Sequence, residues 1–191
     1  MMTCEYDGPA FTEARSHPWT DAVSNADYRY YDFKTQPSLI RTALEDFVPW
    51  SHYAATEDFY GLLEWLNAPE GVLESNDCAF EGPAESDDGY ACSGRLMVLY
   101  RRLETNVAEG AVTELKNRLH HALAALEPEF EQGVVGTTLV PVRFVALPEH
   151  AQLGQQLMLS FWAFGDSEAG VMANLRRVVQ HLAQALREVS P

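Results

Sequence analysis

Basic residues are scarce in this sequence. It has 13 Lys and Arg residues against 28 Asp and Glu, a formal net charge of −15, and its only lysines are Lys34 and Lys116. Proteins that bind nucleic acid neutralise its phosphates with Lys and Arg, and an anionic membrane surface makes the same demand. We therefore expect no nucleic-acid partner and no membrane partner.

Cysteine and long apolar runs are also scarce. Cys4, Cys78 and Cys92 form an odd and sparse set for a secreted chain of this size. No window approaches the roughly 18 uninterrupted apolar residues of a membrane-spanning helix. The initial MMTCEYDGPA has no basic region followed by an apolar stretch, as a signal peptide would. We expect a cytoplasmic protein with reduced thiols.

The motifs of the common enzyme classes are absent. GxxxxGK[ST], GxGxxG after a strand, HExxH, GxSxG and SxxK do not occur, and neither CxxC nor HxxxH indicates a zinc site. Acids and bases that converge only in the fold would escape such a search. From the sequence we assign no catalytic residue, no metal ligand and no cofactor.

Acidic and aromatic residues, by contrast, are abundant and unevenly spread. Residues 1–92 carry 18 acids against 4 bases, whereas residues 93–191 carry 10 against 9. The first stretch also holds 15 of the 21 aromatic residues. Negative potential steers an encounter with a cationic partner, and buried aromatic side chains anchor it. This composition is typical of a surface that binds a basic protein.

The second half has a clear pattern of alternating and helical apolar residues, which predicts the order β-α-β-β-α. The elements are a strand over 95–103, a helix from an Asn106 cap to about Leu126, strands over 137–147 and 155–164 that pair as a hairpin, and a last helix capped by Asp166 or Ser167. Pro141 lacks an N–H and favours an edge position or a bulge. We predict an α+β fold with an antiparallel or mixed sheet packed against amphipathic helices.

The first half is less regular. Its pattern indicates a strand over 28–33, a short helix over 37–47, a helix with Thr56 as its cap, and a long loop or irregular hairpin over 70–92. We predict a single domain over 1–191, in which residues 1–92 form an irregular, helical and acidic elaboration of a core over 93–191.

The acidic segment 74–90 is the strongest local anomaly. It holds Asp77, Glu81, Glu85, Asp87 and Asp88. Clustered like charges usually form a solvated loop, and the same charges would serve a docking loop for a basic partner. Carboxylates could also bind Ca²⁺ or Mg²⁺, but the spacing does not match an EF-hand loop.

Three aromatic residues of the first half lie near expected turns or helix ends: Trp19, Trp50 and Tyr53. Exposed aromatic side chains at such places anchor interfaces, although buried packing explains each one equally well. The surrounding acidic charge favours the interface. Trp162 and Phe164 lie within an expected strand, and we expect them in the core.

Two further features, a group of arginines and one cysteine, each have a structural interpretation as well as a functional one. Arg95, Arg101 and Arg102 would pair with carboxylates of the first half more readily than form an anion pocket. Cys78 would need a nearby histidine to act as a nucleophile, and free cysteines are mostly small buried residues.

We therefore expect a non-catalytic, bacterial protein-binding module for a basic protein partner, with an immunity-type neutraliser of a toxin as one case. The expected contact residues are Trp19, Trp50, Tyr53, Asp77, Glu81, Glu85, Asp87 and Asp88. One alternative is a small-molecule binder or enzyme with a pocket between the sheet and the first half. Another is a self-assembling structural protein, in which the strong apolar stripe of the last helix would serve a homodimer.

Overall fold

Five strands form one mixed sheet in the computed structural model, which describes residues 1–5, 32–144 and 152–190. The strands are β1 (Met2–Glu5), β2 (Leu73–Ser86), β3 (Gly89–Tyr100), β4 (Gly133–Phe144) and β5 (Gln152–Gly165). Their spatial order is β1-β4-β5-β3-β2, and every neighbouring pair is antiparallel except β1 and β4. The predicted α+β class and the predicted β4–β5 hairpin are confirmed.

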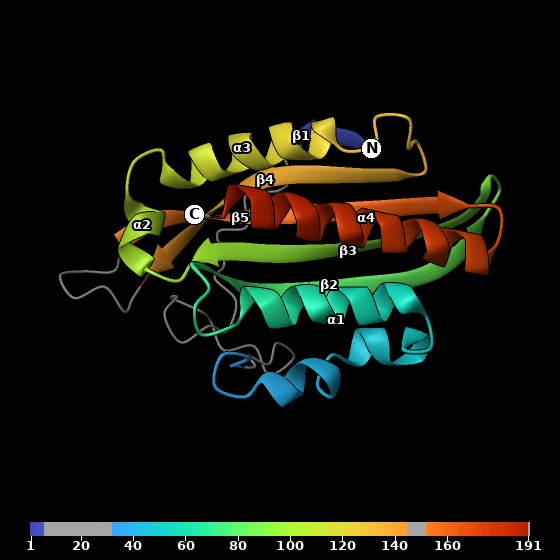
Figure 1. The fold of residues 1–191 in the computed structure, drawn as a ribbon, viewed down its shortest axis with the longest axis horizontal. Coiled ribbons are helices and arrows are strands. Elements are labelled where there is room, and N and C mark those ends of the chain that lie inside the picture. Colours follow the sequence, from blue (N-terminus) through green and yellow to red (C-terminus); the bar gives the residue numbers. More distant parts are fainter. Residues whose placement is uncertain (6–31, 145–151, 191) are drawn as a thin grey trace.

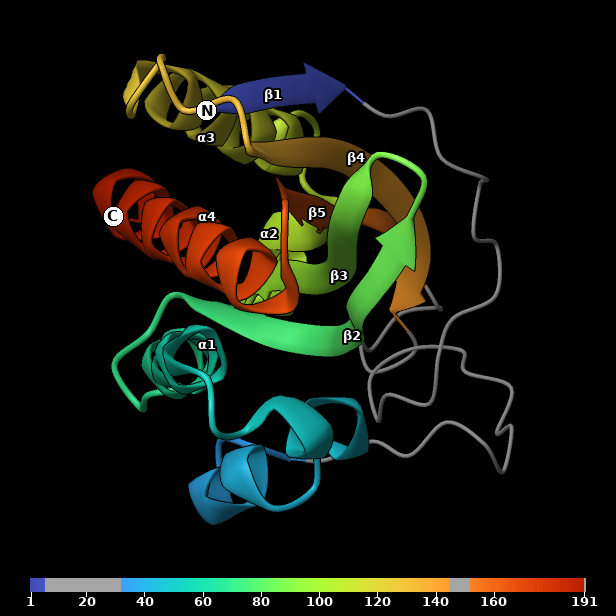
Figure 2. The same ribbon diagram turned by 90° about the vertical axis from the view of Figure 1, so that its right-hand side faces the viewer.

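Three helices cover one face of this sheet: α1 (Ala54–Leu66), α3 (Ala111–Ala125) and α4 (Glu168–Val189) (Figures 1 and 2). The apolar stripe of α4, from Val171 to Val189, is buried against the strands. The Ser167 hydroxyl accepts a hydrogen bond of 3.1 Å from Gly170 N, so Ser167 is the cap that satisfies the first turn. In the described part of the chain, no helix combines the length and apolarity needed to cross a membrane.

The main hydrophobic core lies between these helices and the sheet. It draws on both halves of the sequence, including Phe47, Phe59, Leu96 and Leu182. The expected boundary between residues 92 and 93 falls inside β3. The described residues of the first half contribute to this core through α1 and β2.

The opposite face of the sheet has its own apolar contacts. The short α2 (Leu103–Val107) packs there against Leu99, Val142 and Phe144. A Cβ at Gly154 in β5 would come within 2.5 Å of Asn106 O, so only glycine permits this close approach of α2.

Of the two structures expected for residues 70–92, a long loop or an irregular hairpin, the irregular hairpin is the one that forms, as the main part of β2 and β3. Asp77 in β2 accepts a hydrogen bond of 2.8 Å from Arg95 Nε in β3, which stabilises a charge that the sequence suggests is solvated. Two register shifts, at Ser75/Asp77 and Glu81/Ala84, interrupt the alternation that would have predicted a strand.

Three helix predictions also need correction. Residues 37–47 do not form one helix: a 3₁₀ helix η1 (Pro37–Arg41) is followed by a second, η2 (Glu45–Trp50). Helix α1 begins at Ala54 after Tyr53, and the hydroxyl of the expected cap Thr56 donates to Trp50 O at 2.8 Å.

Asn106 does not cap α3. It is buried in α2, and its side chain accepts from Tyr100 N at 2.9 Å and donates to Tyr100 O at 2.7 Å. Helix α3 starts after Gly110, whose φ of 78° lies in the left-handed region.

Two strand predictions complete the comparison. Of the expected strand over 28–33, residues 28–31 lie outside the described residues, and residues 32 and 33 are not in a strand. Pro141 pairs with Gln155 of β5 in regular register. On the other side of β4, β1 pairs only with the residues from Val134 to Thr137, so β1 does not pair with Pro141.

Candidate functional site

The tip of the β2–β3 hairpin meets the start of α4 at one end of the sheet, on the right in Figure 1. Tyr90 in β3 is in register with Gly165, the last residue of β5. A Cβ at Gly89 would lie 2.8 Å from Gly165 O, and the φ of Gly89 is 119°. Only glycine fits this turn, so the backbone fixes the hairpin tip beside α4.

Acidic side chains gather at this end. Residues 81–90 and 163–170 together contain six acids and no Lys or Arg. We call these six exposed residues the acidic end: Glu81, Glu85, Asp87, Asp88, Asp166 and Glu168. Glu81 accepts a hydrogen bond of 3.2 Å from Ser93 Oγ, and Glu168 accepts one of 2.6 Å from Tyr53 Oη. Among the described residues, the other four form no ion pair.

Several acids elsewhere in the molecule are paired with arginines. Arg41 binds Glu57 and Glu64 at 2.7 and 2.8 Å, and Arg176 binds Asp58 at 2.8 Å. Arg177 binds Glu127 at 2.6 Å. The Arg41 guanidinium lowers the pKa of Glu57, and that of Arg177 lowers the pKa of Glu127. Glu109, Glu129 and Glu131 also form no ion pair among the described residues, so the acidic end is distinguished by having six acids on two adjacent segments that carry no Lys or Arg.

The aromatic residues expected at the interface lie close to this end but are only partly exposed. The indole of Trp50 lies on Gly82 of β2, at a distance that leaves no room for a Cβ. Tyr53 precedes α1, and its hydrogen bond to Glu168 raises the pKa of the phenol. Trp19 lies outside the described residues. Asp77 is paired with Arg95, so it adds no unbalanced charge.

The sequence analysis missed two aromatic side chains, Trp162 and Phe164. Their neighbours in β5, Phe161 and Ala163, point into the core beneath the helices. Because side chains alternate along a strand, Trp162 and Phe164 point away from α1, α3 and α4. Trp162 is half-buried, and 42% of Phe164 is exposed. A run of four apolar residues conceals this alternation, so we placed both residues in the core.

Two of the three thiols, those of Cys78 and Cys92, are poor candidates for catalysis. Burial raises the pKa of Cys92 to about 12, and burial together with the charge of Asp77 raises that of Cys78. A thiol with a raised pKa supplies little of the thiolate that attacks substrates. Within the described ranges, no group of three or more His, Cys, Asp or Glu side chains could hold a metal ion.

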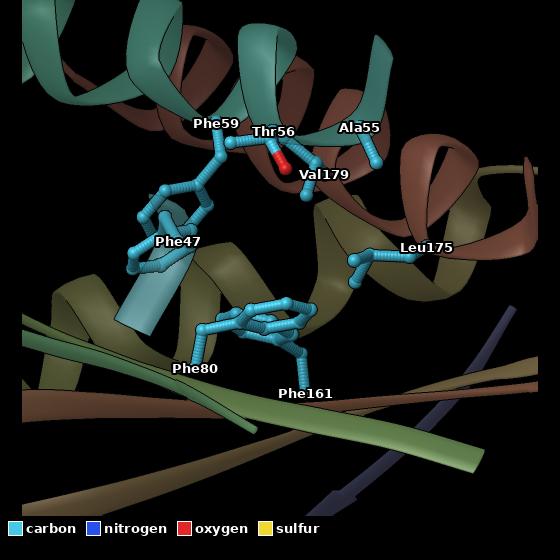
Figure 3. A pocket seen from close by; sticks show the side chains of 8 residues that line it. All are labelled: Phe47, Ala55, Thr56, Phe59, Phe80, Phe161, Leu175 and Val179. Carbon is cyan, nitrogen blue, oxygen red and sulfur yellow. The ribbon is translucent and has the colours of Figure 1, made fainter. Parts of the chain in front are cut away.

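The enclosed cavity between α1 and the sheet is too small for a substrate. It measures about 10 Å³ and is lined mainly by Phe47, Phe59, Phe80 and Phe161 (Figure 3). Phe47 stacks on Phe59 and on Phe80, with ring centroids 4.8 and 5.1 Å apart. Such a volume holds about one water molecule, and the wall of aromatic rings offers that water few partners.

A larger, open groove lies between the ends of α1 and α4. Its volume is about 470 Å³, and its lining includes Trp65, Glu70, Arg187 and Ser190. The Arg187 guanidinium lies over the Trp65 ring, 5.3 Å from its centroid. The lining contains no cysteine or histidine, and among the described residues no hydrogen bond joins Glu70 to Ser190 as a base is joined to the nucleophile it activates.

Among the acidic and basic side chains that the structure describes, Glu74 is the most buried, with 1% of the residue exposed. Its carboxylate lies 2.8 Å from Lys34 Nζ and 3.5 Å from Arg101 Nε. Burial raises the pKa of Glu74 despite both cations. Arg101 also donates to Pro69 O at 2.7 Å, so the cluster ties Lys34 and the turn after α1 to the sheet. The expected pairing of Arg95 and Arg101 with carboxylates of the first half is confirmed.

Comparison with known proteins found no match to the chain among family models, curated proteins or solved structures.

Proposed function

We propose that this chain is a non-catalytic protein-binding module whose acidic end docks a basic protein. The observation that carries the proposal is the clustering of acids at the acidic end, where Glu85, Asp87, Asp88 and Asp166 have no ion pair among the described residues. Paired charges contribute little to the field outside a protein, whereas unpaired ones of one sign steer an oppositely charged partner.

The position of these acids suits docking. A tight hairpin and the first turn of a long helix hold them on a regular backbone, so they are displayed at little entropic cost. Asp166 and Glu168 are also stabilised by the positive N-terminal end of α4, so their presence there has an explanation that needs no binding partner. That explanation does not extend to Glu81, Glu85, Asp87 and Asp88, which belong to the hairpin.

A cytoplasmic, bacterial neutraliser of a cationic toxin is one case within this proposal. An acidic surface can cover a basic site that would otherwise bind phosphate. The support for this case is charge alone. Isolation of the partner would identify it.

The proposal is tested by affinity capture from a lysate of the native cells with three immobilised baits. These are the wild-type chain, a triple variant Glu85→Ser, Asp87→Ser, Asp88→Ser, and a control Glu109→Ser, Glu129→Ser, Glu131→Ser, which removes three exposed acids elsewhere. We expect a basic protein on the wild type and the control at low salt, with less on both at high salt. The triple variant at Glu85, Asp87 and Asp88, which we call the hairpin variant, should no longer capture that protein. Equal capture by all three baits would contradict the proposal.

A further inference from the structure

The face of the sheet that points away from α1, α3 and α4 carries an aromatic residue in line with an acid. Trp162 in β5 is in register with Ser93 in β3, and Ser93 with Glu81 in β2. Residues directly opposite one another in antiparallel strands point to the same face. The hydrogen bond from Ser93 Oγ to Glu81 Oε2, 3.2 Å long, agrees with this register.

A second row lies beside the first, nearer the hairpin tip. Phe164 in β5 is in register with Ala91 in β3, and Ala91 with Ala84 in β2. The backbone of Phe164 is fixed on both sides, because its N–H donates to Gln132 O at 2.9 Å and its carbonyl accepts from Asn174 Nδ2 at 2.7 Å. The ring is thus held in place while 42% of the residue stays exposed.

The two rows together form what we call the aromatic patch: Trp162, Phe164, Ser93, Ala91, Ala84 and Glu81. Small side chains occupy β3 and lie between the rings of β5 and the carboxylate of Glu81 in β2. Neighbouring strands are about 4.8 Å apart, so the carboxylate and the rings are separated by roughly 10 Å at the backbone. A long side chain can lie across the small residues and reach both.

The chemistry of the patch selects a flat cation. An aromatic face attracts a cation, and a planar guanidinium can stack on it while its N–H groups bond a carboxylate. A lysine ammonium is more strongly hydrated and lacks the plane that stacks. A second copy of this chain fits less well, because the acids near the patch would repel one another.

Resting on the proposed function, we propose that the aromatic patch receives arginine side chains of the basic partner. The acidic end then supplies the attraction, while Trp162 and Phe164 supply the preference for arginine over lysine. The proposal places the contact on the open face of β5, β3 and β2, beyond the residues that the sequence analysis selected.

The test uses fluorescently labelled hexa-arginine and hexa-lysine peptides, with binding followed by fluorescence anisotropy. The variants are Phe164→Ala, Glu81→Gln and a control Leu153→Ala, which removes another exposed apolar side chain from β5. In parallel, ¹⁵N NMR follows the Trp162 indole N–H, assigned as the signal that Trp162→Phe removes. Native fold is verified from the rest of the amide spectrum.

We expect hexa-arginine to bind the wild type more tightly than hexa-lysine, and the Trp162 indole signal to shift saturably. Phe164→Ala should weaken hexa-arginine binding roughly fivefold and hexa-lysine binding less, since a well-ordered cation–π contact contributes that order of affinity. Leu153→Ala should leave both affinities unchanged.

The hairpin variant Glu85→Ser, Asp87→Ser, Asp88→Ser is measured with the same peptides. Three results would overturn the inference. If the hairpin variant loses binding while Phe164→Ala binds like the wild type and the Trp162 signal does not move, the patch is excluded and the docking role of the acidic end survives. If neither peptide binds the wild type at low salt, the inference and the proposed function both fail. Dimerisation of the free chain through Phe164 would assign the patch to a second copy.

Discussion

Trp50 and Gly82 are in direct contact, because the indole at the end of η2 lies on the α-carbon of Gly82 in β2. A Cβ at position 82 would overlap the ring atoms. This contact joins the 3₁₀ segment to the edge strand of the sheet, close to the acidic end. It explains why a glycine interrupts a strand and why Trp50 is only partly exposed.

Replacing this glycine should displace the indole. We expect Gly82→Ala to destabilise the protein by about 2 kcal/mol, as overpacking does, and to shift tryptophan fluorescence. Gly61→Ala is the control, because nothing lies within 4 Å of a Cβ there and alanine suits the interior of α1. Urea unfolding measures both. Equal stability of Gly82→Ala and wild type would show that Trp50 does not pack on Gly82.

The buried Asn106 should contribute more to the stability of the fold than its place in a short helix suggests. Its side chain binds both backbone polar groups of Tyr100, the last residue of β3. Asn106→Ala leaves those groups without these partners, and we expect a loss of about 2 kcal/mol in the free energy of unfolding. Asn117→Ala, at an exposed position of α3, should change stability by no more than about 0.5 kcal/mol. A similar small effect at Asn106 would disprove its role in joining α2 to β3.

The raised pKa of Glu74 predicts a particular pH dependence. Between its ordinary value of 4.5 and the higher value in the fold, the folded protein holds a proton that the unfolded chain releases. This group's contribution to stability should therefore fall as pH rises through that window. Lys34 and Arg101 oppose the effect of burial, and the charge of Asp32 adds to it.

The test compares the wild type with Glu74→Gln, which cannot titrate. Urea unfolding from about pH 4 to about pH 8 should show the stability of the wild type, relative to the variant, decreasing as pH rises. An increasing difference would mean that Lys34 and Arg101 outweigh burial and lower the pKa of Glu74.

The account also predicts that Cys92 is chemically inert in the native state. Only 3% of the residue is exposed, and its pKa is raised to about 12. Iodoacetamide at mildly alkaline pH should label Cys92 at the rate of global unfolding and rapidly in urea. Mass spectrometry of peptides measures this labelling. Fast native labelling of Cys92 would reopen the question of a reactive thiol.

The sequence predicted the regular second half of the fold best. Helix α4 combines a continuous apolar stripe with a Ser167 cap, and the β4–β5 hairpin consists of two long apolar runs. In each case the local pattern and the tertiary packing agree. The α+β class follows from these elements.

For the acidic hairpin the sequence left two alternatives open, a long loop and an irregular hairpin. Glu74 and Asp77 look like solvated charges until Lys34, Arg101 and Arg95 are placed beside them. Bulges further hide the strand period. The short strand β1 forms only by pairing with the distant β4. The face of the sheet to which Trp162 and Phe164 point likewise depends on the pairing of β5 with β3, which a single apolar run does not encode.

The most direct test of the central claim is the association rate of the captured basic partner, measured across a series of salt concentrations. Glu85→Ser, Asp87→Ser, Asp88→Ser should slow association at low salt and flatten its salt dependence, while thermal stability changes little. The control Glu109→Ser, Glu129→Ser, Glu131→Ser has the same net charge and should associate like the wild type. If the hairpin variant and the control associate equally fast at low salt, the acidic end is not the docking surface.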